Sequence, residues 1–148
     1  MASRQIHDSP RGWVRRHIRE YVETDGRNGQ RWSGVDTLLL TTRGRRTGKL
    51  RRTALIHGLD RDRYLVVGSA GGARRHPSWY PNLRADPDVL AQVGAECFDA
   101  RARTASPRER PLPWRITTSI WPEYDRYQDR TEREIPVVII ERRWPCSV

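Results

Sequence analysis

The sequence has little cysteine, a single lysine and no long apolar run. Its two cysteines, Cys97 and Cys146, lie far apart and form no CxxC pair, and its four histidines show neither HxxxH nor HExxH spacing. A zinc site or thioredoxin-type motif is therefore not expected, nor is any other metal site. No apolar stretch approaches the roughly 20 residues of a membrane-spanning helix, and residues 1–10 lack the apolar region of a secretory signal. We expect a soluble, cytoplasmic protein.

Basic residues are abundant and nearly all are arginine. The chain carries 28 Lys and Arg against 18 Asp and Glu, which gives a formal net charge of +10, and Lys49 is the single lysine. This excess makes an anionic partner a candidate: nucleic acid, acidic lipid, or a ligand with phosphate and carboxylates. A GC-rich genome would also raise the arginine content, so only the local arrangement of the arginines is informative.

An amphipathic helix is expected over residues 10–23. Pro10 follows Ser9 at a position typical of the first helical residue, and apolar side chains recur from there at helical spacing. Residues 25–29 hold the Gly, Asn and Asp that commonly end a helix. We expect the apolar face to pack on the rest of the protein. The alternative is a peripheral contact of this basic helix with a membrane surface.

The remaining pattern predicts a small α+β barrel with about six mainly antiparallel strands. The expected strands are residues 36–42, 51–59, 64–69, 89–93, 96–104 and 135–141. The first three predict an antiparallel meander, and the apolar last run predicts a strand buried on both faces. Short helices are expected at 81–85 and 122–130, and a helical region should begin at the capping box formed by Ser106 and Glu109. The length of 148 residues predicts one domain, with residues 1–30 as helix and linker and residues 35–141 as the core.

A tight loop between two expected strands concentrates positive charge. It carries Arg45, Arg46, Thr47, Gly48 and Arg51, and it offers backbone N–H groups and guanidinium groups to an anion. The loop differs from a phosphate-binding P-loop: three residues instead of four separate Gly44 from Gly48, Leu50 replaces the Ser or Thr that would hold magnesium, and a strand follows instead of a helix. We exclude nucleotide hydrolysis. An anion-binding loop and a solvated hairpin tip remain the two interpretations.

Two further segments could line a pocket. Glycines within residues 68–72 would let a flat ligand approach the backbone, while Trp79 and Asn82 could supply an apolar wall and an amide, although a tryptophan such as Trp79 is more often part of a core. Tyr124 and Tyr127 share one face of an expected short helix, with Trp121 just before it. These aromatic side chains could line the pocket and donate a hydrogen bond to a carbonyl, or simply pack against the barrel.

Taken in this order, the segments resemble the deazaflavin-dependent nitroreductase and quinone reductase family, whose members use coenzyme F420. The matching residues are Leu39, Leu40, Thr41, Thr42, Arg43, Gly44, Thr47, Gly48, Lys49, Arg51, Ser69, Gly71, Gly72, Pro77, Trp79, Tyr80, Asn82, Leu83, Ala85, Pro87, Trp121, Pro122, Tyr124, Tyr127, Gln128, Thr131, Arg133, Glu134, Ile135, Pro136 and Val137. The resemblance extends from about residue 21 to residue 141.

The resemblance implies a split β-barrel, similar to FMN-binding folds, that transfers a hydride from reduced F420 to a quinone, nitroaromatic or enone. The coenzyme's phosphate and oligoglutamate tail would be held by Arg45, Arg46, Thr47, Gly48 and Arg51. Its ring would be held by Ser69, Ala70, Gly71, Gly72, Pro77, Ser78, Trp79 and Asn82. The acceptor pocket would be shaped by Trp121, Tyr124 and Tyr127, with a tyrosine or solvent as the proton donor.

Two positions depart from the family pattern. Ala70 stands where lysine is frequent, so a tail-binding charge is missing there, for which Arg74 or Arg75 could substitute, and Ala54 stands where proline is common. The alternatives are a barrel that binds FMN or haem instead, and a basic nucleic-acid-binding module, for which the sequence has no helix-turn-helix, RRM or zinc-finger signature. The acceptor is expected to be a small molecule, and the protein to be a monomer or homodimer.

Overall fold

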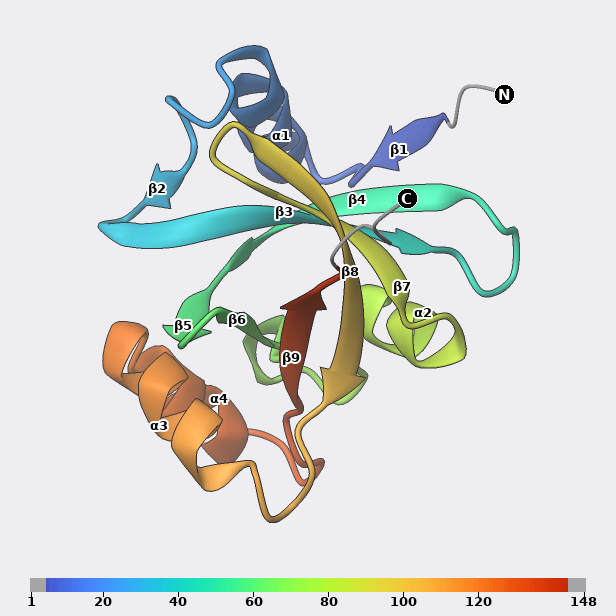
Figure 1. Ribbon diagram of the computed structural model, residues 1–148. Helices are drawn as coiled ribbons and strands as arrows, with labels where there is room; N and C mark the ends of the chain where they lie inside the picture. Colours follow the sequence, from blue (N-terminus) through green and yellow to red (C-terminus); the bar gives the residue numbers. More distant parts are fainter. Residues whose placement is uncertain (1–4, 144–148) are drawn as a thin grey trace.

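Nine strands form one twisted sheet in the computed structural model, which describes residues 5–143 (Figure 1). The strands are β1 (Ile6–Asp8), β2 (Arg31–Trp32), β3 (Val35–Arg43), β4 (Leu50–Ile56), β5 (Gly58–Asp60), β6 (Arg63–Val67), β7 (Asp88–Val93), β8 (Glu96–Thr104) and β9 (Val137–Arg142). The helices are α1 (Gly12–Glu23), α2 (Trp79–Ala85), α3 (Pro111–Ile120) and α4 (Glu123–Asp129), with a short 3-10 turn, η1 (Ala70–Gly72). The α+β class is confirmed. The expected six strands are too few because β1, β2 and β5 have only two or three residues each.

The strand order is β1-β4-β3-β7-β8-β9-β6-β5, and β2 pairs with β3. Every pair is antiparallel except β1 with β4, which is parallel. β4 and β5 follow each other directly in the chain, yet they lie near opposite ends of this order. A single segment that turns at His57 therefore connects the two ends of the sheet.

This turn corrects the strand expected over residues 51–59. Its first part pairs with β3 as β4, and its second part pairs with β6 as β5. The N–H of His57 donates to the carbonyl of Asp36 (3.0 Å), and its ring is buried edge-on against Tyr64. Both antiparallel connections of the expected meander are present, the first as β3 with β4 and the second as β5 with β6. The expectation of one unbroken middle strand is wrong, because the chain bends at His57 and its two halves pair at opposite ends of the sheet.

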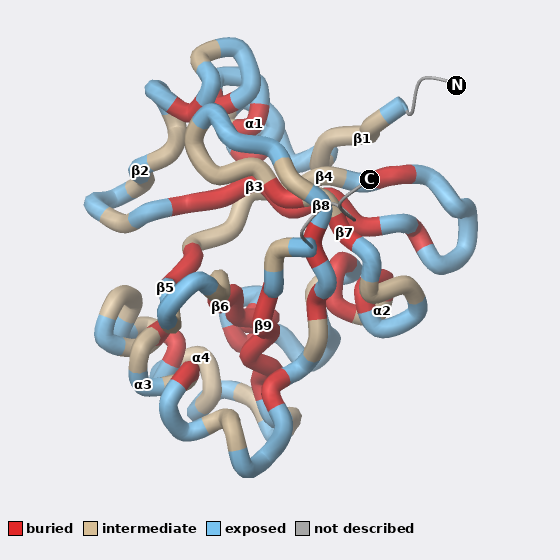
Figure 2. Tube along the Cα trace, in the orientation of Figure 1, coloured by how far each residue is buried: buried red, intermediate tan, exposed pale blue. Residues whose placement is uncertain are grey.

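Apolar runs in β3 and β9 supply the core. Leu38, Leu39 and Leu40 are at most 1% exposed, and so are residues 137–140, which confirms the expected burial of the last strand on both faces. Figure 2 shows both strands as long buried stretches. The main core cluster joins side chains of β3, β6, β8 and β9 to α2, whose Trp79 and Leu83 pack against it. The core thereby fixes the position of α2 relative to the sheet.

Helix α1 packs its apolar face on the sheet, as expected. Val14, Ile18 and Tyr21 are buried against Leu39, with Ala54 beside them. The Tyr21 hydroxyl also donates to the Thr37 carbonyl (3.1 Å) and accepts from the N–H of Gly94 (2.8 Å). The helix is therefore held by both hydrogen bonds and apolar contacts.

The helix begins at Gly12, so the expected start at Pro10 is wrong. The helix starts two residues later than expected, because β1 pairs with β4 and the N–H of Ser9 donates to the Arg52 carbonyl (2.9 Å). Residues 1–30 were expected to contribute a helix and a linker, but β1 makes part of that segment a strand of the sheet.

Helices α3 and α4 lie together beyond β5 and β6 (Figure 1). The capping box is confirmed: the Ser106 N–H donates to Glu109 Oε1 (3.0 Å), and the Glu109 N–H donates to Ser106 Oγ (3.2 Å). A turn follows, and the regular helix starts at Pro111. Arg103 binds the same carboxylate, and this hydrogen bond lowers the pKa of Glu109 to about 2. Helix α4 lies within one residue of its expected limits.

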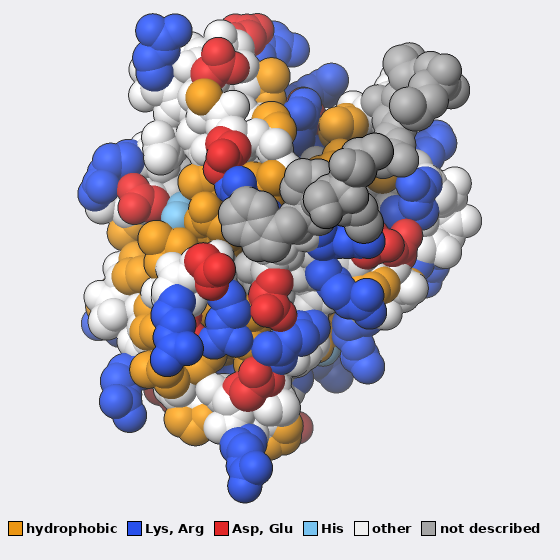
Figure 3. Space-filling view, in the orientation of Figure 1, with side chains coloured by type: hydrophobic (Ala, Val, Ile, Leu, Met, Phe, Trp, Pro, Cys, Tyr) orange, Lys and Arg blue, Asp and Glu red, His pale blue; other side chains and the backbone are white. Residues whose placement is uncertain are grey.

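The surface and the remaining residues add three observations. On the face shown in Figure 3, Lys and Arg side chains are scattered, with acidic side chains among them. Within residues 5–143 no helix is long and apolar enough to cross a membrane. Cys97 is a free, exposed thiol, whereas Cys146 lies outside the described residues.

Candidate functional site

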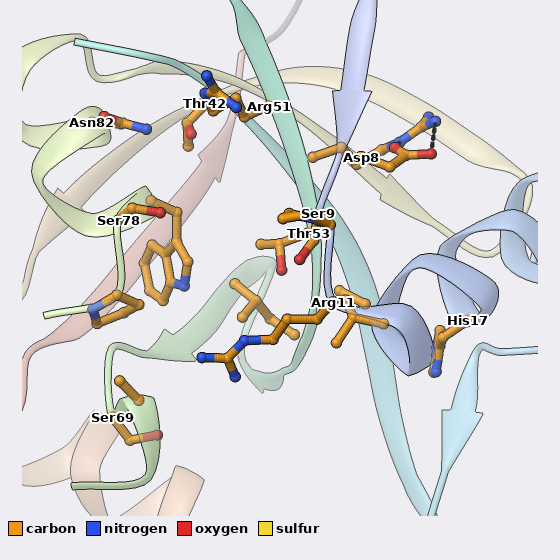
Figure 4. A pocket seen from close by; sticks show the side chains of 18 of the residues that line it. Asp8, Ser9, Arg11, His17, Thr42, Arg51, Thr53, Ser69, Ser78 and Asn82 are labelled. Atoms are coloured by element: carbon orange, nitrogen blue, oxygen red, sulfur yellow. Dashed lines mark hydrogen bonds and ion pairs between the residues drawn. The ribbon is translucent and has the colours of Figure 1, made fainter. Parts of the chain in front are cut away.

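A cavity of about 790 Å³ opens between the sheet, α1, α2 and α4 (Figure 4). This volume lies within the roughly 300–1,000 Å³ that small-molecule pockets occupy. All but two of the sequence-predicted site residues line it: Arg45, Arg46, Thr47, Arg51, Ser69, Ala70, Gly71, Pro77, Ser78, Trp79, Asn82, Trp121, Tyr124 and Tyr127. The exceptions are Gly48 and Gly72. The fold thus brings together three segments that are far apart in the chain.

The basic loop, residues 44–51, connects β3 to β4 at one part of the cavity wall. The N–H of Gly44 donates to the Lys49 carbonyl (2.7 Å), and the N–H of Gly48 donates to the Gly44 carbonyl (2.8 Å). These bonds close the loop, and Gly48 supports it through a positive φ of 73° instead of lining the cavity. The N–H groups of Arg46 and Thr47 have no acceptor within residues 5–143. They remain available to an anion.

The three arginines of this loop have no acidic partner in the described chain, and Arg45 bonds instead to Asn82. Arg43 pairs with Asp86 and Arg52 pairs with Asp8, whereas no carboxylate lies within ion-pair distance of Arg46 or Arg51. Both side chains line the cavity. The loop therefore presents positive charge that the described residues do not neutralise.

Asn82 fixes the loop to helix α2. Its side chain is 3% exposed, and Oδ1 accepts from both the backbone N–H (3.1 Å) and the guanidinium (2.8 Å) of Arg45. The sequence suggested an amide that faces a ligand, but the oxygen of this amide is already used inside the protein. Its Nδ2 has no acceptor among residues 5–143 and is the atom still able to bind a ligand.

The glycine-rich turn that follows β6 is held from behind by Arg133. The guanidinium donates to the carbonyls of Gly68 (3.2 Å), Ser69 (2.7 Å) and Ala73 (2.8 Å). It also contacts His76 Nδ1 (3.0 Å). These bonds hold the turn in place, and Ser69 lies in the cavity wall (Figure 4).

The two glycines of this turn have different roles. Gly71 (φ 63°) lines the cavity, and a Cβ there would meet nothing within 4 Å. Gly72 (φ 82°) lies away from the cavity, where a Cβ would come within 2.6 Å of the Tyr127 carbonyl oxygen. Gly72 therefore lets η1 pack directly on α4, and only Gly71 leaves room for a ligand.

Trp79 satisfies both interpretations of the sequence, because it is 8% exposed, belongs to the main core and also lines the cavity. Tyr124 is 6% exposed, and burial raises the pKa of its phenol well above the ordinary value. Tyr127 packs edge-on against it, with ring centroids 6.2 Å apart. The Tyr124 hydroxyl thus remains protonated at neutral pH and can donate a hydrogen bond into the cavity.

Sequence reasoning missed the contribution of the N-terminal segment to the cavity wall. Asp8, Ser9, Arg11 and Trp13 line it, and so does Trp32 from β2. The position of the N-terminal residues depends on the pairing of β1 with β4, and no local pattern in the sequence indicates that pairing. Trp32 is placed by the pairing of β2 with β3. Thr42 was also missed: it lines the cavity, and its buried Oγ1 has no hydrogen-bond partner.

Ala70 lines the cavity. Arg74 and Arg75, in the stretch between η1 and α2, are not among the lining residues, and the substitution of one of them for the missing lysine stays a prediction. Arg11 is a lining arginine contributed by the N-terminal segment. Within residues 5–143 no cluster of three or more His, Cys, Asp or Glu side chains could hold a metal ion.

Comparison with known proteins identifies the family. A family model described as F420H(2)-dependent quinone reductase matches residues 13–142. The chain belongs to the F420H(2)-dependent quinone reductase family. One curated member, an F420H(2)-dependent quinone reductase of Mycobacterium tuberculosis (strain H37Rv), is 41% identical over 134 residues, which cover 88% of this chain and 90% of that protein.

Solved structures agree with membership of the F420H(2)-dependent quinone reductases. An F420-H2 dependent reductase (FDR-A) superposes with a TM-score of 0.66 at 39% identity, covering 71% of this chain and 93% of that one. A structure described as a domain-swapped dimer superposes at 0.68 with 37% identity, covering 90% and 100%. HutZ, a haem storage protein of Vibrio cholerae, is only 17% identical at a TM-score of 0.53 over 88% and 91%, and this likeness concerns the fold alone.

Proposed function

We propose that this chain is an F420H(2)-dependent oxidoreductase that passes a hydride to a quinone, nitroaromatic or enone. The observation that carries the proposal is the cavity, which joins unneutralised arginines of the basic loop to a wall of aromatic side chains and an open glycine. A flat ring with a long anionic tail matches this set of groups, because the ring needs apolar contact and the tail needs cations.

The fold within this proposal is a split β-barrel. The continuous segment from β4 to β5 connects the two ends of the strand order, which supports a closed, barrel-like arrangement of the sheet. The cavity lies against the outer side chains of β4 and the helices that cover it.

The residues of the basic loop would hold the phosphate and carboxylates of the tail. Arg46 and Arg51 supply charge, while the N–H groups of Arg46 and Thr47 supply directed donors. Ser69, Gly71 and the Nδ2 of Asn82 would surround the ring, with Trp79 as its apolar wall. Bound reduced F420 supplies the chemistry, a hydride that leaves with both electrons of its C–H bond.

The acceptor would lie between the ring and the aromatic group, which we define as Trp13, Trp32, Trp121, Tyr124 and Tyr127. Stacking orients a flat acceptor and excludes water. A phenol is protonated at neutral pH, so the Tyr124 hydroxyl can donate a hydrogen bond to an acceptor oxygen. Burial raises the pKa of Tyr124 and makes it a weaker acid, so Tyr127 and solvent stand beside it as sources of the proton that completes the reduction.

The test is to mix the purified protein with reduced F420 and a panel of quinones, nitro compounds and enones, following the loss of coenzyme absorbance. We expect turnover with at least one class, and binding of oxidised F420 by calorimetry at low salt. Absence of coenzyme binding in either redox state would refute the proposal.

Two controls separate the alternatives. FMN shares a flat ring but lacks the oligoglutamate tail, so an Arg46→Ala/Arg51→Ala variant should lose F420 binding far more than any FMN binding. A nucleic-acid-binding module would instead show an affinity for DNA or RNA that falls steeply with salt, without coenzyme binding. Haem binding would be visible as a Soret band on titration.

The proposed location is the cytoplasm, with peripheral membrane contact through α1 as a testable addition. Trp13 and Val22 are the exposed large apolar residues of this helix. Cosedimentation with anionic vesicles measures that contact. For assembly, β1 is an edge strand held by three residue pairs, and light scattering distinguishes a monomer from a homodimer.

A further inference from the structure

The N-terminal segment adds one cation to the cavity wall, Arg11, to which the proposed coenzyme site assigns no role. Arg11 lines the cavity, and its side chain extends from the residue before α1 toward the segments that carry Ser69 and Ser78 (Figure 4). No side chain within residues 5–143 forms a hydrogen bond or ion pair with its guanidinium. Arg51, from the basic loop, lies on the other side of Thr53 in this view.

The cavity itself offers Arg11 no counter-charge. Asp8 is the single acidic residue in the described lining, and Arg52 binds both of its oxygens (2.6 and 3.2 Å). Arg11 is an exposed residue, so water solvates its guanidinium in the free protein. Because the one carboxylate of the described lining is already bound by Arg52, the guanidinium can form a charge-assisted hydrogen bond with an anionic oxygen of a bound molecule.

The segment around Arg11 is fixed in place. Residues 6–8 pair in parallel with residues 50–52, and the Asp8–Arg52 ion pair connects the side chains of these two strands. Trp13, two residues after Arg11, stacks on Trp32 with ring centroids 6.0 Å apart. Trp32 in turn contacts Trp121 (5.5 Å). Arg11 is thus placed beside the aromatic group, which is the part of the wall assigned to the acceptor.

We propose that Arg11 selects acceptors that carry a negative charge next to a flat quinoid or aromatic ring. The ring would contact the aromatic group, and the guanidinium would donate to the ionised oxygen or carboxylate. This inference rests on the proposed function for the reaction, and it adds a substrate class and a specificity-determining residue. The N-terminal segment then forms the acceptor side of the cavity, whereas the basic loop serves the coenzyme.

The experiment compares two quinones of nearly equal shape. 2-Hydroxy-1,4-naphthoquinone is an anion at neutral pH, and 1,4-naphthoquinone is neutral. Their dissociation constants are measured by quenching of tryptophan fluorescence in the full chain, with and without saturating oxidised F420. An Arg11→Gln variant should bind the anionic quinone about tenfold to a hundredfold more weakly, as expected for loss of one charge-assisted contact. Binding of the neutral quinone should change less than twofold.

Matched variants make the result decisive. Arg15→Gln removes the same charge from an exposed position of α1 outside the cavity wall and should bind both quinones normally. Arg11→Lys should recover part of the preference, and in turnover assays the loss in Arg11→Gln should appear in KM more than in kcat.

Three outcomes would overturn the proposal. Arg11→Gln could weaken the binding of both quinones equally, or it could leave the preference for the anionic quinone unchanged. It could also weaken the binding of F420 itself, which would assign Arg11 to the coenzyme tail. Failure of the wild-type protein to bind F420 would refute the proposed reaction instead, and the coenzyme-free quinone titration would still report on Arg11.

Discussion

The two parts of the cavity wall are built in different ways. The basic loop takes its charges from one short stretch, so residues that are neighbours in the chain act on the same ligand group. The aromatic group and Arg11 come from three separate stretches, which meet only after β1 and α1 have packed on the sheet. A local motif therefore indicates the coenzyme, while the acceptor side depends on long-range topology. The following predictions test this division, beginning with the largest effect.

Removing the charge of the basic loop should affect the coenzyme alone. We expect Arg46→Ala/Arg51→Ala to weaken F420 about a thousandfold, because two charge-assisted contacts worth roughly 2 kcal/mol each are lost. Calorimetry measures this change. The control Arg74→Ala/Arg75→Ala removes the same charge outside the cavity. An equal loss in this control would mean that overall charge, rather than the loop, binds the coenzyme.

The two glycines of η1, Gly71 and Gly72, should contribute differently to the stability of the protein. Gly72→Ala should destabilise the protein by about 3 kcal/mol, because a methyl group would collide with the Tyr127 carbonyl in addition to the cost of a positive φ. Gly71→Ala carries the conformational cost alone, about 1 kcal/mol. Urea unfolding gives both values. Similar losses in the two variants would show that η1 and α4 are not in the close contact described.

Replacing both tyrosines of the aromatic group should slow turnover while leaving the coenzyme bound. We expect Tyr124→Phe/Tyr127→Phe to lower kcat about tenfold, since solvent can still supply a proton, and to change the F420 dissociation constant less than twofold. Single variants assign the effect. Unchanged turnover in the double variant would remove both hydroxyls from the reaction.

The smallest expected effect is a pH dependence of stability caused by His57, a residue that does not line the cavity. Burial lowers the pKa of His57, so the unfolded chain takes up a proton more readily than the native one. The contribution of neutral His57 to the free energy of unfolding should be complete above about pH 6.5, the ordinary pKa of histidine. This contribution should decrease as the pH falls below that value. His57→Gln should reduce this slope in unfolding experiments, leaving the part due to His76, whose pKa is also lowered by burial. A slope equal to that of the wild type would contradict the assignment.

Local signals in the sequence predicted most of the regular elements. Ser106 and Glu109 bond to each other as a capping box does, and the apolar run at residues 137–140 is buried on both faces. The single strand expected over residues 51–59 failed at His57, because nothing in its β-type composition marks the point where it leaves one partner for another. β1 was missed because three residues with no alternation become a strand only through the free edge of β4.

The candidate site follows the same rule. Nearly all residues proposed from the sequence lie on one cavity, since each belonged to a compact motif. Arg11 and Trp13 could not be assigned there, because their place depends on how β1 and α1 meet distant strands. Trp32 was missed because it lies on β2, a strand of only two residues that pairs with the adjacent β3. Gly48 and Gly72 belong to the same motifs but do not line the cavity. Each allows a backbone turn with a positive φ, and Gly72 also allows close packing on α4, which the sequence alone does not reveal.

The pairing of β1 with β4 has a practical consequence for any shortened version of this protein. The family model begins at residue 13, so a chain trimmed to that boundary would keep every proposed coenzyme contact and still lose the strand that carries Asp8 and the residue that reaches the acceptor. Such a truncation would separate coenzyme binding from the selection of the acceptor. It would retain the ability to load the coenzyme while its choice among oxidants broadened.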